Sequence, residues 1–107
     1  MKKEKIIKDN KKFTEIINKN NSKKSKYFSI YYEKADINKY GITIPKKIAK
    51  ANVRNRIKRR IKNIIVKNEK VIQNSFYYVI IVKKAILELN YQNMEQELLK
   101  LIKKERD

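Results

Sequence analysis

The chain has 107 residues, 41% of them hydrophobic, which is enough for one domain (residues 1–107) with a modest core. Lys and Arg outnumber Asp and Glu by 29 to 11, and the net charge of +18 makes a polyanion the expected partner. The absence of Cys and His excludes disulfides, thiolate or imidazole metal sites and the commonest general base. No apolar run could span a membrane and the charged N-terminus is no secretory signal, so we expect a cytoplasmic protein without a membrane partner.

The N-terminal part predicts a helix followed by a polar loop. Residues 9–20 place Phe13, Ile16 and Ile17 at helical spacing, and Asp9 or Asn10 could cap the first turn. Residues 21–25, NSKKS, are typical of a loop.

Two strands are expected next. Residues 26–33, KYFSIYYE, are rich in aromatic and β-branched side chains. Because side chains alternate along a strand, one face should carry Tyr27, Ser29 and Tyr31 and the other Phe28, Ile30 and Tyr32. Residues 40–45 predict a second strand, which ends at the one Pro and is near enough in sequence to pair antiparallel with the first.

The C-terminal half predicts helix, strand and helix. Residues 47–68 carry an apolar stripe at a period of 3.6, and residues 76–82, FYYVIIV, are typical of a covered central strand. A last amphipathic helix follows from Tyr91. The stripe of the long helix consists of Val53, Ile57, Ile61, Ile64 and Ile65.

The order helix, strand, strand, helix, strand, helix predicts an α/β (α+β) fold, a two-layer sandwich with helices over one small sheet. The long helix between the second and third strands would allow those two strands to be parallel.

The long helix also concentrates the arginines. Four of the five Arg residues lie between positions 54 and 60, and no acidic residue occurs between Asp36 and Glu69. A merely solvated helix usually mixes charges of both signs and gains from pairs four residues apart, whereas like charges at that spacing are unfavourable. The pattern therefore favours a phosphate-binding face, for which the bidentate guanidinium is well suited.

The segment PKKIAKANVRNRIKRR resembles the signature of the bacterial ribonuclease P protein subunit, in which two lysines precede an Arg-Asn-Arg helix. The early Phe13, the aromatic strand at 28–31 and the strand at 78–85 are similar to the same family. The matching positions are Lys46, Lys47, Ala51, Arg54, Asn55, Arg56, Lys58 and Arg59.

This resemblance implies a function and a fold detail. In that family a catalytic RNA with bound Mg²⁺ hydrolyses the bond that releases the 5′ leader of precursor tRNA, and the protein assists as a non-catalytic subunit. It also implies a left-handed crossover between the parallel strands, against the usual right-handed rule. No catalytic or metal-binding residue and no DNA partner is then expected of the chain itself.

The resemblance also implies two sets of binding residues. The catalytic RNA would be bound by Lys46, Lys47, Lys50, Arg54, Asn55, Arg56, Lys58, Arg59, Arg60 and Lys62. The precursor-tRNA leader would lie in a cleft formed by Phe13, Ile17, Tyr27, Ser29, Tyr31 and Thr43.

Alternatives remain open from the residues alone. For Phe13 and Phe28, so small a domain favours a core position over a stacking platform. A ribosomal or other structural RNA-binding protein is the alternative function. A DNA-binding protein could use the same basic helix in a groove, but the sequence has no helix-turn-helix pattern, which argues against it. A stand-alone nuclease is disfavoured because this chain has no close carboxylate pair and no His. A membrane-surface helix is disfavoured because the apolar stripe of the long helix contains no Trp or Phe.

Overall fold

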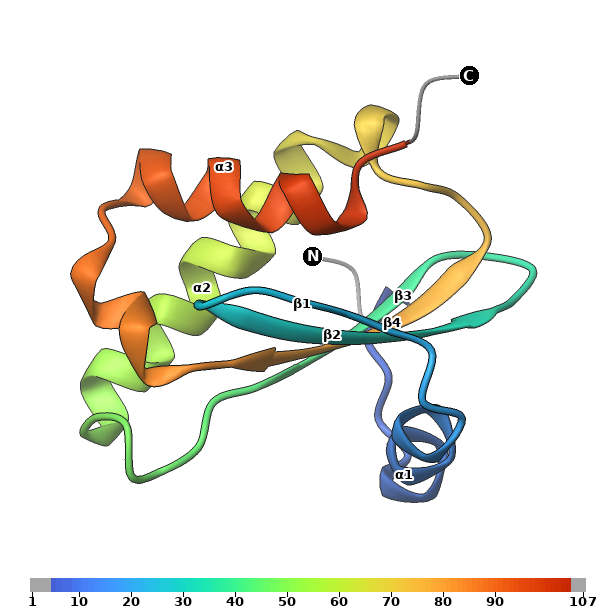
Figure 1. Cartoon of the computed structure of the whole chain (residues 1–107), viewed down its shortest axis with the longest axis horizontal. Coiled ribbons are helices and arrows are strands. Elements are labelled where there is room, and N and C mark those ends of the chain that lie inside the picture. The colour runs from blue at the N-terminus through green and yellow to red at the C-terminus, as the bar shows by residue number, and fades with distance from the viewer. Residues whose placement is uncertain (1–4, 105–107) are drawn as a thin grey trace.

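The computed structural model describes residues 5–104 and is a four-stranded sheet with helices on both faces (Figure 1). Helices α2 and α3 lie on one side of the sheet and α1 lies on the other. The predicted α+β class is confirmed, and α1 adds a partial third layer to the expected sandwich. The elements in chain order are α1 (Asn10–Asn18), β1 (Ser22–Lys24), β2 (Phe28–Lys34), β3 (Lys39–Thr43), α2 (Ala51–Lys67), β4 (Phe76–Val82) and α3 (Tyr91–Ile102), with short 3-10 helices η2 (Glu69–Val71) and η3 (Lys84–Glu88).

The strand order is β1-β2-β4-β3, so β4 lies between β2 and β3. It pairs antiparallel with β2 and parallel with β3. The prediction that β2 and β3 pair with each other is therefore wrong, because the most apolar strand takes the central place, where both faces are covered. The parallel crossover through α2 is confirmed, and its left-handed sense stays a prediction.

The segment expected to be a polar loop contains β1, which pairs antiparallel with β2. Its residues, Ser22–Lys24, are polar because an edge strand contributes backbone hydrogen bonds rather than apolar side chains. Charged side chains on such an edge also discourage pairing with other chains.

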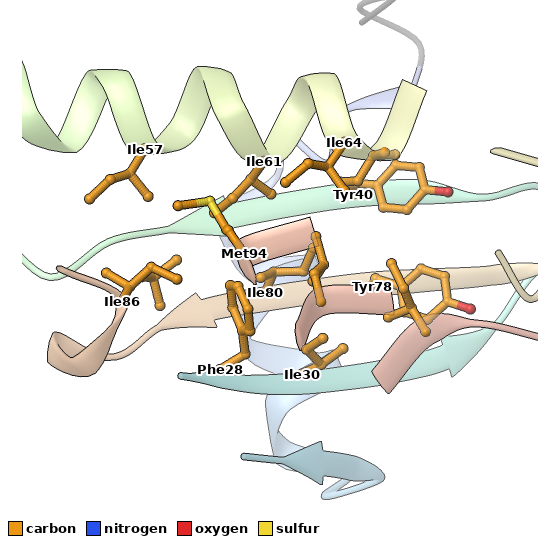
Figure 2. Packing of buried hydrophobic residues seen from close by; sticks show 14 of the residues in the cluster. Phe28, Ile30, Tyr40, Ile57, Ile61, Ile64, Tyr78, Ile80, Ile86 and Met94 are labelled. Atoms are coloured by element: carbon orange, nitrogen blue, oxygen red, sulfur yellow. The ribbon is translucent and has the colours of Figure 1, made fainter. Parts of the chain in front are cut away.

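The larger core lies between the sheet and the helices α2 and α3 (Figure 2). Ile57, Ile61 and Ile64 point from α2 towards Phe28, Ile30 and Ile80 of the sheet. Each fully buried side chain of this size stabilises the fold by about 1.5–3 kcal/mol. The predicted stripe of α2 is confirmed, with Ile57, Ile61, Ile64 and Ile65 buried and Val53 half-buried.

Helix α2 begins at Ala51 rather than at residue 47. The preceding residues form a turn in which the backbone N–H of Ile48 donates to the carbonyl of Pro45 over 3.1 Å. Ile48 is buried, so this turn is fixed to the body of the protein.

A smaller core fixes α1 to the opposite face of the sheet. The buried residues are Ile7, Ile16 and Val79. Asp9 caps the helix as predicted, because its carboxylate accepts a hydrogen bond of 2.9 Å from the backbone N–H of Lys11.

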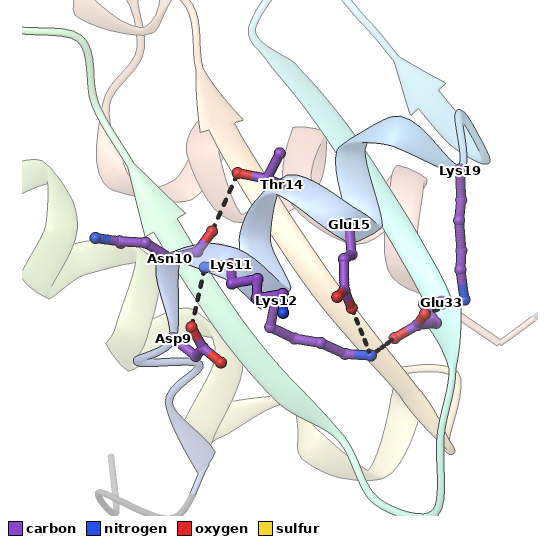
Figure 3. A network of polar contacts seen from close by, with 8 residues as sticks. All are labelled: Asp9, Asn10, Lys11, Lys12, Thr14, Glu15, Lys19 and Glu33. Carbon is purple, nitrogen blue, oxygen red and sulfur yellow. Dashed lines mark hydrogen bonds and ion pairs between the residues drawn. The ribbon is translucent and has the colours of Figure 1, made fainter.

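A buried carboxylate adds an electrostatic anchor to this helix (Figure 3). Glu33 of β2 is only 8% exposed, and its Oε2 lies 2.7 Å from Nζ of Lys12. Its Oε1 binds the ammonium of Lys19, which is almost two turns further along α1. Lys12, and then Lys19, hold the pKa of Glu33 below its usual value, while burial opposes them. Two points of the helix are thereby tied to one strand.

We expect Glu33→Gln to destabilise the protein at neutral pH by about 1 kcal/mol, a modest figure because both lysines are partly exposed and screened. A lowered folded-state pKa stabilises above the unfolded pKa, about 4.3, and this advantage disappears as the pH falls through the folded pKa. Urea unfolding of both proteins from pH 7 to pH 3 should therefore show the difference shrinking below about pH 4.

The control is Glu88→Gln, which removes a carboxylate from an exposed pair with Lys26. This change should alter the free energy of unfolding by less than about 0.5 kcal/mol. Equal losses in the two variants at neutral pH would contradict the anchoring role of Glu33.

Candidate nucleic-acid interface

Helix α2 turns its cations away from the sheet. Its buried isoleucines occupy one side, while Arg56, Lys58 and Arg59 are exposed and Arg60 and Lys62 are half-buried beside them. Asn55 is exposed on the same outer side. The packing of the stripe therefore decides which way the basic side chains face.

These cations are not neutralised by the described part of the protein. Within residues 5–104, no side-chain hydrogen bond or ion pair involves Arg56, Lys58, Arg59, Arg60 or Lys62. The same holds for Lys46 and Lys47 in the turn and for Lys50 at the N-cap. The ion pairs within this range are Lys12–Glu15, Lys12–Glu33, Lys19–Glu33, Lys26–Glu88, Lys67–Glu95 and Lys100–Glu97. Of these pairs only Lys67–Glu95 involves α2, at its last turn, and the remainder of its basic face stays free for an external anion.

The N-terminal end of α2 adds a further attraction for anions. Its first turn contains no acidic residue, and Lys50 at the N-cap makes no side-chain capping bond. The aligned peptide dipoles give this end a partial positive charge, at which cations such as Arg54 are unfavourable unless an anion binds. Charge and dipole therefore act together at the start of the helix.

Arg54 differs from the other arginines of the helix. Its Nε donates a hydrogen bond of 3.1 Å to the carbonyl oxygen of Ala49, and the side chain is half-buried. This bond closes the turn before α2. Arg54 consequently has a structural contact in addition to any contact with a partner, which the helical projection of the sequence could not indicate.

A shallow pocket on the outer side of α2 brings part of the predicted set together. Its lining contains Asn55, Lys58, Arg59 and Lys62 of that set. It also contains Asn52, which the sequence analysis missed although it precedes Asn55 by one helical turn. Amide and cationic groups in one pocket suit phosphate and sugar oxygens.

The α1 face of the sheet collects most of the predicted leader-binding residues. Phe13, Ile17 and Tyr31 all pack against the smaller core. Strand register places Ser29 beside Ile81, and Ile81 beside Thr43, in the adjacent row of the same face. Of these three, Thr43 is exposed, Ile81 is half-buried and Ser29 is only 9% exposed.

Tyr27 does not belong to this face. It precedes β2 and packs against the larger core on the other side of the sheet. The expectation that Tyr27 shares a face with Tyr31 is therefore wrong, because strict alternation applies only within the regular strand.

Phe13 lies directly over Gly41 of β3. A Cβ atom at position 41 would come within 2.2 Å of Cζ of Phe13, so the ring depends on the absence of a side chain there. Phe13 is half-buried, and Phe28, for which a core position was favoured, is fully buried in the larger core. Phe28 is thus a core residue, while Phe13 combines packing with some exposure.

One pocket joins the two predicted sets of residues. A cavity of about 200 Å³ is lined by Phe13 and Gly41 on one side and by Lys58 and Lys62 of α2 on the other. The α1 face and the basic face of α2 therefore meet along β3.

Lys24 is a further residue of the α1 face that the sequence analysis missed. Its ammonium lies 5.6 Å from the centroid of the Tyr31 ring, a cation–π distance. It was missed because β1 was taken for a loop, and a loop gives no register against Tyr31.

Two absences concern the described residues only. No three His, Cys, Asp or Glu side chains of residues 5–104 are grouped so that they could hold a metal ion. Within the same range, no helix is long and apolar enough to cross a membrane.

The fold and the basic face of α2, where Arg56, Lys58 and Arg59 have no side-chain partner among residues 5–104, together define a small basic α+β protein of the kind that binds RNA. The sequence profile of the Ribonuclease P family matches residues 1–106. The ribonuclease P protein component of Mycoplasma mycoides is 42% identical over 96% of this chain and 97% of its own. That of Streptococcus agalactiae is 33% identical over 96% and 95%. The solved structure of the ribonuclease P protein from Thermotoga maritima superimposes with a TM-score of 0.85 at 26% identity, covering 94% of this chain and 97% of the other. The chain belongs to the ribonuclease P protein family.

Proposed function

We propose that this protein is the protein subunit of ribonuclease P, which removes the 5′ leader from precursor tRNA. The observation that carries the proposal is the uncompensated basic face of α2 in a chain of this family. A rigid helix that presents several free cations and two amides suits the phosphates of a folded RNA. We propose that this RNA is the catalytic subunit, bound by α2, the turn at Lys46 and Lys47, and Lys50.

The chemistry is assigned to the RNA subunit. Mg²⁺ bound by that RNA would supply the activated water and stabilise the leaving oxygen. Among residues 5–104 no three His, Cys, Asp or Glu side chains are grouped, so the proposal assigns no metal ligand to the protein. The role of the protein is then to bind and orient two RNAs, in the cytoplasm, where no membrane contact is needed.

The leader is assigned to the α1 face of the sheet. Phe13 and Tyr31 offer partly exposed rings, Ile17 adds apolar surface, and Ser29 and Thr43 add hydroxyl groups. Lys24 beside Tyr31 adds a cation. Aromatic rings edged by lysines bind single strands with little sequence preference, as a variable leader requires.

The direct test is cleavage of a precursor tRNA at low Mg²⁺ by a bacterial ribonuclease P RNA, with and without the protein. We expect the protein to stimulate cleavage only when the RNA is present. Cleavage by the protein alone would replace the proposal with a nuclease, and RNA binding without stimulation would indicate another ribonucleoprotein, such as the ribosome.

Arg56→Ala should weaken binding to ribonuclease P RNA and lower the slope of log K against log salt by about 1, because one phosphate contact is lost. The fold should be unchanged, since Arg56 is exposed and bonds to nothing within residues 5–104. Filter binding over a range of salt concentrations measures the slope. Lys100→Ala, which removes a cation from the exposed face of α3, is the control and should keep the wild-type slope. The same slope for all three proteins would refute the role of Arg56.

Tyr31→Ala should weaken binding of leader-bearing precursor tRNA by about 1–3 kcal/mol, the worth of one base stacked on a ring. Mature tRNA, which has no leader, should bind the variant and wild-type holoenzymes equally. The control is Tyr32→Ala, because Tyr32 directly follows Tyr31 in β2 but faces the larger core. An equal loss for precursor and mature tRNA in Tyr31→Ala would refute the leader assignment.

A further inference from the structure

A second polar surface lies on the other side of α1 from Phe13. Strand register places Glu33, Tyr77 and Lys39 in one row across β2, β4 and β3, on the face that α1 covers. Lys12 reaches this row from α1 through its bond to Glu33. The proposed leader residues lie four positions away from this row, Ser29 before Glu33 in β2 and Thr43 after Lys39 in β3.

This row borders a pocket of about 550 Å³. Its lining comes from four parts of the chain: the segment before α1, α1 itself, β3 and β4. The lining consists of Ile6, Ile7, Lys8, Asp9, Lys12, Lys39 and Tyr77.

Two cations converge on one aromatic ring in this pocket. The ammonium groups of Lys12 and Lys39 each lie 5.8 Å from the centroid of Tyr77. The ring attracts both groups through its quadrupole, although the two like charges repel each other. An anion that enters the pocket would relieve this repulsion.

The nearby carboxylates are already engaged. Asp9 caps α1 by accepting the bond from the backbone of Lys11, and Glu33 binds Lys12 and Lys19. Within residues 5–104 the ammonium of Lys39 has no carboxylate partner, and it lies over the ring of Tyr77. Lys8 is exposed at the rim and is equally unpaired in that range. The pocket thus retains positive charge after its internal contacts are satisfied.

We propose that this pocket binds a phosphate group of single-stranded RNA, with Lys39 as its principal cation and Lys8 and Lys12 beside it. The inference rests on the proposed function only in taking RNA as the ligand. A helix with its side chains is about 10 Å wide, so a single strand that crosses α1 could occupy the leader surface and this pocket together. The protein would then hold a strand on both sides of α1.

The test uses the free 107-residue protein and a fluorescently labelled oligouridylate of about 12 nucleotides, a usual length for a single-strand site. Anisotropy titrations over a series of salt concentrations give the slope of log K against log salt. For Lys39→Gln we expect the slope to fall by about 0.7, the value for one phosphate contact to a single strand, and the affinity to fall several-fold. Lys39→Arg keeps the charge and should keep the wild-type slope.

Lys100→Gln is the matched control, because it removes the same charge from α3 on the opposite side of the sheet. Circular dichroism and thermal unfolding should show that Lys39→Gln and Lys39→Arg remain folded. A slope for Lys39→Gln equal to that of Lys100→Gln would overturn the inference.

The cleavage assay separates this inference from the proposed function. If the slope depends on Lys39 but ribonuclease P RNA is not stimulated, the phosphate site stands and the subunit assignment fails. If cleavage is stimulated but Lys39→Gln behaves like Lys100→Gln, the subunit assignment stands and the phosphate site is refuted.

Discussion

The structure depends on covering the central strand β4 on both faces. Val79 and Ile80 are adjacent, fully buried and point to opposite sides of the sheet. One side therefore needs α2 and α3, and the other needs α1. Because α2 can cover the sheet only with its isoleucine stripe, its cations must face outward. The hydrophobic requirement of one strand thus orients the basic face and also creates a second helix–sheet surface beneath α1.

The distribution of the few carboxylates is the second constraint. A net charge of +18 opposes compactness, and an even distribution of acids would relieve it best. Instead, Glu33 fixes α1, and Glu95 joins α3 to the end of α2 through Asn68 and Lys67. On the outer face of α2, neighbouring cations such as Lys58 and Lys62 therefore repel each other. Any RNA or phosphate that binds this face only in the folded state therefore also stabilises the fold.

The elements that were predicted correctly are those in which the local pattern and the tertiary role coincide. Strand β4 was located at residues 76–82 because a short, continuous run of apolar β-branched and aromatic residues indicates a strand covered on both faces. The stripe of α2 and the cap of α1 at Asp9 were also predictable, because each depends only on residues close together in the sequence. Strand β1 was not found, since Ser22–Lys24 contribute only backbone bonds, and the pairing of β2 with β4 joins segments far apart in sequence. The bond from Arg54 to Ala49 and the side chosen by Tyr27 depend on irregular backbone, for which no periodicity exists.

The two proposed RNA surfaces are held at a fixed distance by strand β3. Phe13 packs on Gly41 of this strand from the α1 side, and Lys58 and Lys62 of α2 line the same pocket. Helix α1 cannot shift without disturbing β3, because the ring of Phe13 is packed directly against the backbone of Gly41. For the proposed function, binding energy gained from the leader on one surface would then orient the precursor relative to the catalytic RNA on the other. A catalytic RNA that positions its substrate in this way needs the protein to be rigid rather than reactive.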